Sequence, residues 1–184
     1  AVDSPIAASR LETRIMSPAI GEEVAGVDLT QPLEDTQVQE LRALLLKHQL
    51  LVFRDQPLNA AQHVAFARRF GELEVHPVFP HDPDYPELVL LGGNHTQPGR
   101  ENIYHSDVSW RAEPSMGSIL RCIECPPAGG DTIWCNMALA YENLPPHIKD
   151  ILHQLEAVHD LLPGFVDRAP EQDRAALRDR FPAQ

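Results

Sequence analysis

Apolar residues recur at helical spacing in the stretch that follows residue 35. Val38, Leu41 and Leu44 fall on one face, and Thr36–Gln39 has the residue types of a capping box. The next apolar run, Leu50–Phe53, is short and uninterrupted, which is typical of a buried strand. The pattern predicts a helix that begins near residue 36 and a strand directly after it.

Two further stretches also have helical periodicity. One opens at Asn59, has Gln62 three residues later and meets a stop signal at Gly71. The other covers about Pro146–Leu155, where apolar residues form a stripe. The charged segment from Pro163 onward is predicted to be a surface helix or a mobile segment.

Short apolar runs separated by Pro-Asp, Gly-Gly and Pro-Pro pairs dominate the chain after residue 71. Helices first and strands later favour an α+β protein with a mainly β core, in which helices pack on an antiparallel sheet without alternating β-α-β units. The candidate strands are Val75–Phe79, Leu88–Leu91, Ser118–Glu124 and Thr132–Asn136.

The charge balance excludes several classes of partner. The 184 residues contain 15 Lys and Arg against 27 Asp and Glu, so the net charge is −12 with neutral histidines. A strongly acidic chain without a basic patch does not favour nucleic acid or anionic membranes. Its apolar runs are far shorter than the roughly 20 residues of a membrane-spanning helix. We therefore expect a cytoplasmic protein with one domain over residues 1–184.

Three cysteines, an odd number, favour reduced thiols. Cys122 and Cys125 have the spacing of half a zinc site, but the sequence holds no second half. We expect these residues and Cys135 to be small buried apolar side chains near a strand.

His105 and Asp107 form the most informative chemical pattern. In an extended segment, residues two apart point to the same side, so this imidazole and carboxylate would converge. A His-x-Asp pair supplies two of the three ligands of the facial triad that binds non-haem iron(II). The bare pair is a weak signal, because a strand histidine hydrogen-bonded to a nearby aspartate has the same sequence.

The sequence around this pair strengthens the iron interpretation. Several segments closely resemble, in the same order, the taurine dioxygenase family of iron(II)- and 2-oxoglutarate-dependent oxygenases, over about residues 11–162. The segments are Gly26–Leu33, His48–Gln56, Arg69–Leu73, His76–His81, Asn102–Trp110, Glu113–Leu120 and Pro126–Trp134.

The resemblance implies a site for the metal and the cosubstrate. His105 and Asp107 would be two iron(II) ligands, and Thr132 of the Gly-Gly-Asp-Thr motif would hydrogen-bond the distal carboxylate of 2-oxoglutarate. O2 would be the third reactant. The family's second iron histidine and its 2-oxoglutarate arginine lie far toward the C-terminus. We expect them beyond Gln184, so that residues 1–184 form an incomplete catalytic domain.

The resemblance also implies residues that contact a small anionic substrate. His76 matches the histidine that contacts the sulfonate in the taurine-cleaving members. Phe79 stands where those members have tyrosine, so one polar contact is missing. Asn102 precedes the iron-binding histidine and is a candidate pocket residue, and Trp110 replaces the usual phenylalanine.

The implied fold is a double-stranded β-helix, or jelly roll, with buttressing helices. The favoured function is hydroxylation of taurine or a related alkylsulfonate at the carbon that bears sulfur, with release of sulfite and an aldehyde alongside succinate and CO2. The same chemistry on alkyl sulfate esters or aryloxyalkanoates is the first alternative. A non-catalytic jelly-roll binding module is the second. Because family members are often homo-oligomers, identical copies are among the expected partners.

Overall fold

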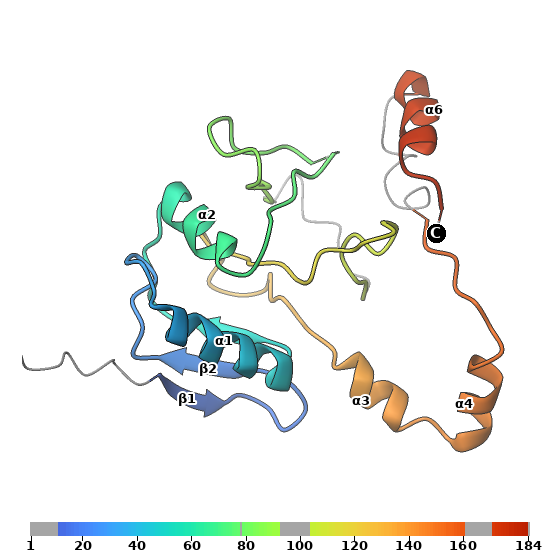
Figure 1. Ribbon diagram of the computed structural model, residues 1–184, viewed down its shortest axis with the longest axis horizontal. Helices are drawn as coiled ribbons and strands as arrows, with labels where there is room; N and C mark the ends of the chain where they lie inside the picture. The colour runs from blue at the N-terminus through green and yellow to red at the C-terminus, as the bar shows by residue number, and fades with distance from the viewer. Residues whose placement is uncertain (1–10, 78, 93–103, 161–170, 184) are drawn as a thin grey trace, which may run out of the picture. The chain divides into compact units, whose positions relative to one another are not determined.

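The computed structural model describes residues 11–77, 79–92, 104–160 and 171–183 (Figure 1). Asn102 lies outside these described residues. The chain divides into two compact units. Unit 1 comprises the described residues of Ala1–His76, Pro80–Leu90 and Trp134–Leu139, and unit 2 comprises those of Pro77–Phe79, Leu91–Ile133 and Ala140–Gln184.

Unit 1 contains a three-stranded sheet in the order β1-β2-β3. Strand β1 (Glu12–Ile15) pairs antiparallel with β2 (Glu22–Ala25), and β2 pairs parallel with β3 (Leu51–Phe53), as Figure 1 shows. Helix α1 (Asp35–His48) lies between β2 and β3 in the chain, so these elements form a β-α-β unit. The expectation that no such unit exists is wrong, because a 14-residue helix is long enough to return the chain for a parallel strand.

Helix α1 confirms the predicted helix, but its cap differs from the prediction. The capping box consists of Glu34 and Gln37, where the backbone N–H of Glu34 donates to Gln37 Oε1 at 3.0 Å. The Thr36–Gln39 interpretation was therefore wrong by two residues. The helix ends at Gln49, which adopts a left-handed conformation with a φ of 63°.

Helix α2 (Ala60–Arg68) has the cap that the sequence predicts. The backbone N–H of Gln62 donates to Asn59 Oδ1, and the backbone N–H of Asn59 donates to Gln62 Oε1, both at 2.9 Å. Beyond the helix, Arg42 of α1 donates to the carbonyl oxygens of Arg69 and Phe70 at 3.1 and 2.5 Å. These bonds connect the end of α2 to α1.

The core of unit 1 is apolar and lies around α1 and the sheet. The Gln56 side chain holds the loop that contains Val27 and Leu29. Its Oε1 accepts from the Leu29 N–H at 2.8 Å, and its Nε2 donates to the Val27 carbonyl at 3.1 Å. The buried side chains that form the core cluster are Leu11, Val24, Leu29, Leu33, Val38, Leu41, Leu58 and Phe66.

The strands predicted after residue 71 are wrong for the described residues. His81 and Val89 form an isolated bridge, and the described segments 118–124 and 132–136 have no regular structure. Isolated strands leave backbone donors and acceptors unpaired, so they require a neighbouring strand. The regular β structure of the described residues is therefore the three-stranded sheet β1-β2-β3, and the expected mainly β core is not seen in them.

Short helices account for the regular structure of the C-terminal part. They are α3 (Met137–Glu142), α4 (Pro146–Leu152) and α6 (Glu171–Arg180). Helix α4 confirms the predicted third helix but ends three residues early. Of the segment predicted to be a surface helix or a mobile segment, α6 is a helix over Glu171–Arg180. Within the described ranges, no helix is long and apolar enough to cross a membrane.

The expectation that the three cysteines are buried near a strand is wrong. Cys122, Cys125 and Cys135 are all exposed. They lie in segments that form no strand among the described residues, so no sheet covers them. The described residues also contain no group of three or more His, Cys, Asp or Glu side chains that could hold a metal ion.

Candidate functional site

His105 and Asp107 lie close together in unit 2. The distance between His105 Nε2 and Asp107 Oδ1 is 3.3 Å, and the two side chains are 54% and 65% exposed. Asp107 begins a turn that covers residues 107–110, so the extended segment assumed for this pair does not continue beyond Asp107. The expected convergence of the imidazole and the carboxylate is confirmed.

Ser118 contacts the same carboxylate from a distant part of the sequence. Its Oγ donates to Asp107 Oδ2 at 3.3 Å, while Oδ1 faces His105. The two carboxylate oxygens therefore have different neighbours, which limits rotation of the carboxylate. Sequence reasoning placed Ser118 only at the start of a predicted strand, and no local pattern indicates this contact.

The turn after Asp107 has an unusual backbone conformation. Val108 has a φ of 46°, and the backbone N–H of Arg111 donates to the Val108 carbonyl at 3.0 Å. A β-branched residue in the left-handed region is strained. The chain thus reverses direction directly behind the candidate ligands, and the surrounding structure has to hold this conformation.

The donor set fits part of a metal site. A neutral imidazole nitrogen and a carboxylate oxygen are both ligands of non-haem iron(II), and here they face each other across 3.3 Å. Since the described residues offer no third histidine, cysteine or carboxylate beside this pair, the pair accounts for two protein ligands. A hydrogen bond to a ligating carboxylate, as from Ser118, is the usual outer support of such a site.

The remaining predicted residues have different environments. Thr132 is exposed in an irregular segment that follows two glycines in the left-handed region. A Cβ atom on Gly130 would lie 3.2 Å from Pro126 Cγ, so the turn before Thr132 favours glycine for both conformation and space. Phe79 is partly buried in unit 2, and His76 is partly buried in unit 1. The predicted roles of these residues remain predictions.

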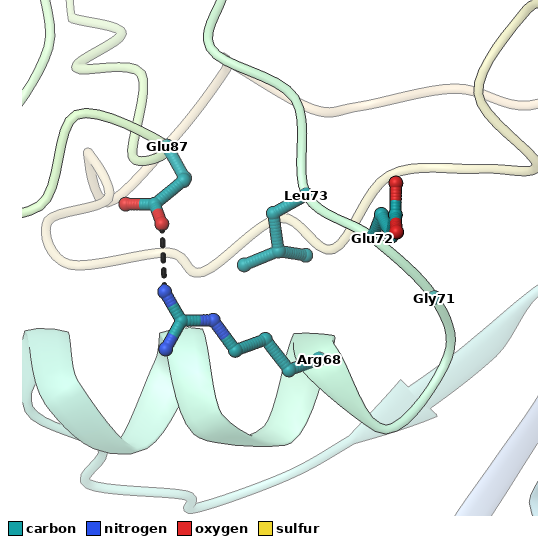
Figure 2. A pocket seen from close by; sticks show the side chains of 5 residues that line it. All are labelled: Arg68, Gly71, Glu72, Leu73 and Glu87. Carbon is teal, nitrogen blue, oxygen red and sulfur yellow. Dashed lines mark hydrogen bonds and ion pairs between the residues drawn. The ribbon is translucent and has the colours of Figure 1, made fainter.

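An open hollow of about 630 Å³ lies in unit 1, lined by Arg68, Gly71, Glu72, Leu73 and Glu87 (Figure 2). None of the predicted site residues lines it. Arg68 Nη2 and Glu87 Oε1 form an ion pair of 2.8 Å, shown as the dashed line in Figure 2. A backbone N–H and the Arg68 guanidinium lower the pKa of Glu87. The charge of Arg68 is thus balanced, and the hollow does not favour an anionic ligand.

Comparison with known proteins decides the family. Residues 12–184 match the model of the TauD, TfdA family, described as taurine catabolism dioxygenase. The chain belongs to this family. A taurine dioxygenase structure from Burkholderia xenovorans is 39% identical, has a TM-score of 0.71, and is matched over 82% of this chain and 54% of that chain. Such TauD-like dioxygenases have a jelly-roll fold, and the described residues of this TauD/TfdA chain, a small sheet with helices, are similar in structure to part of it.

Curated relatives of this TauD/TfdA chain carry several substrate names. An alpha-ketoglutarate-dependent sulfate ester dioxygenase from Pseudomonas putida is 33% identical, over 92% of this chain and 56% of the relative. An alpha-ketoglutarate-dependent 2,4-dichlorophenoxyacetate dioxygenase from Cupriavidus pinatubonensis is 35% identical, over 78% of this chain and 56% of the relative. The chain spans about half the length of these relatives.

Proposed function

We propose that the protein is an iron(II)- and 2-oxoglutarate-dependent dioxygenase that hydroxylates a small organic anion. The observation that carries the proposal is the convergence of His105 and Asp107, with Ser118 on the second carboxylate oxygen. Membership of the TauD/TfdA family supports it, as do the names of the relatives.

The protein residues bind and orient the reactants. His105 and Asp107 would hold iron(II), Ser118 would keep the carboxylate turned toward the metal, and Thr132 would hydrogen-bond the distal carboxylate of 2-oxoglutarate. When bound, the iron would supply the oxidation of 2-oxoglutarate by O2 to succinate and CO2, coupled to hydroxylation of a substrate carbon. Thr132 is an exposed residue and therefore accessible to a cosubstrate.

For the substrate, we favour an alkyl sulfate ester over taurine. Phe79 lacks the phenol hydroxyl that the taurine-cleaving members have at this position, so the contact it offers is apolar. The name of the Pseudomonas putida relative supports the same class. Hydroxylation of the carbon that bears the ester oxygen gives a hemiacetal sulfate. Its C–O bond to sulfate then breaks, the hydroxyl loses its proton, and an aldehyde and sulfate are released.

Assays of the full-length protein with hexyl sulfate, taurine and phenoxyacetate should show the most succinate with hexyl sulfate. Sulfate release from hexyl sulfate, sulfite release from taurine and phenol release from phenoxyacetate identify the bond that is broken. Phe79→Tyr should raise taurine turnover relative to hexyl sulfate, because the phenol restores a polar contact. A preference of the unaltered protein for taurine would overturn the substrate choice. Metal binding without succinate from any of the three would favour a binding module.

Replacing Ser118 by alanine should weaken divalent metal binding by about tenfold, the lower end of the effect of removing such an outer hydrogen bond. Asp107 would lose the donor to Oδ2, and its carboxylate would rotate more freely. The dissociation constant for Mn(II), measured from the electron paramagnetic resonance signal of the unbound ion, tests this. Ser118→Thr keeps a hydroxyl and should bind Mn(II) nearly as well as the unaltered protein. Equal affinities of the alanine and threonine variants would contradict the role of the hydroxyl.

A further inference from the structure

Trp110 stands apart from the other apolar residues of unit 2. It is 6% exposed, and it is the only apolar side chain of unit 2 that is buried among the residues that the structure describes. It also lies three residues after Asp107, at the end of the strained turn. The one buried apolar ring of the described part of unit 2 therefore lies on the same turn as the candidate metal ligand Asp107.

The group that covers Trp110 comes from the C-terminal end of the chain. The ring of Phe181, directly after α6, meets the Trp110 ring edge to face, with centroids 4.6 Å apart and an angle of 73°. The Arg111 guanidinium lies 4.9 Å from the Trp110 ring centre and 5.5 Å from that of Phe181. Edge-to-face aromatic pairs stabilise a contact beyond its buried area, and cation–π contacts add to this.

This cluster of Trp110, Arg111 and Phe181, which we name the aromatic anchor, is joined to the strained turn. The Arg111 N–H donates to the Val108 carbonyl, so one anchor residue closes the turn with its backbone and contacts both rings with its side chain. A left-handed non-glycine residue is strained and persists where surrounding contacts hold it. The aromatic anchor supplies such contacts.

We propose that the aromatic anchor positions Asp107 for metal binding, with Phe181 acting through Trp110 and the turn. Trp110 is then a positioning residue and not the substrate contact that the sequence suggested. The inference rests on the proposed function, because it takes His105 and Asp107 as iron(II) ligands. The proposal means that Phe181, directly after α6, also affects how well the site at His105 and Asp107 binds a metal.

The test measures Mn(II) binding to the full-length protein by electron paramagnetic resonance. Phe181→Ala should raise the Mn(II) dissociation constant about tenfold, as for loss of an outer support of a metal site. Phe181→Tyr keeps the ring and should restore the affinity, and Phe181→Leu should fall between them. Leu46→Ala, at a 79% exposed position of α1 in unit 1, is the control and should leave the constant unchanged. Circular dichroism checks that each variant is folded.

A double-mutant cycle separates an effect on the position of Asp107 from a general loss of structure in unit 2. Because Trp110 and Phe181 would act as one unit, Trp110→Ala combined with Phe181→Ala should weaken Mn(II) binding no more than the stronger single change. Unchanged affinity in folded Phe181→Ala and Phe181→Leu, or losses that simply add, would overturn the inference. If the unaltered protein itself binds no Mn(II), the proposed function fails, and the role of the aromatic anchor fails with it.

Discussion

Asp107→Ala in the full-length protein should reduce iron-dependent succinate formation to the background of the assay. A methyl group cannot ligate a metal, and the change also removes the group that faces His105 Nε2 at 3.3 Å and accepts from Ser118. Succinate produced from 2-oxoglutarate, with iron(II) and hexyl sulfate supplied, is the measurement. The Mn(II) dissociation constant should rise in parallel.

A matched aspartate on the same unit provides the control. Asp150 is exposed on α4, and Asp150→Ala removes an equal charge without touching the His105 and Asp107 pair. It should leave succinate formation and metal affinity unchanged. Turnover by Asp107→Ala at the level of Asp150→Ala would remove Asp107 from the metal site and the iron-dependent mechanism with it.

Leu41→Ala should give the largest loss of stability in unit 1. Leu41 lies on α1 in the centre of the core and is 0% exposed, so truncation leaves a cavity as well as losing buried area. Such changes cost about 2–5 kcal/mol of unfolding free energy. Denaturant unfolding, followed by circular dichroism, measures the difference from the unaltered protein.

The control for this change lies on the same helix. Leu46 is 79% exposed, and Leu46→Ala should alter the unfolding free energy by no more than about 0.5 kcal/mol. The pair separates burial from helix propensity, because both changes replace leucine by alanine within α1. Equal losses in the two variants would contradict the assignment of Leu41 to the core.

Local patterns predicted those elements whose contacts are close in the sequence. The cap of α2 was predictable because Asn59 and Gln62 satisfy each other across three residues. The same reasoning misplaced the cap of α1. Glu34 with Gln37 and Thr36 with Gln39 are both chemically acceptable capping pairs, and the structure has the earlier pair, which gives the longer helix. The strands expected after residue 71 failed for a different reason, because a strand needs a partner that the described residues do not provide.

The sequence by itself determined the pairing of His105 with Asp107 and the family to which the chain belongs. Residues two apart in the sequence can approach each other in an extended segment or at the start of a turn, so the convergence did not depend on a fully extended backbone. Only the tertiary structure revealed Ser118 on Asp107 Oδ2 and Phe181 on Trp110. Contacts between residues so far apart depend on how the backbone turns, and no local pattern of residue types encodes them.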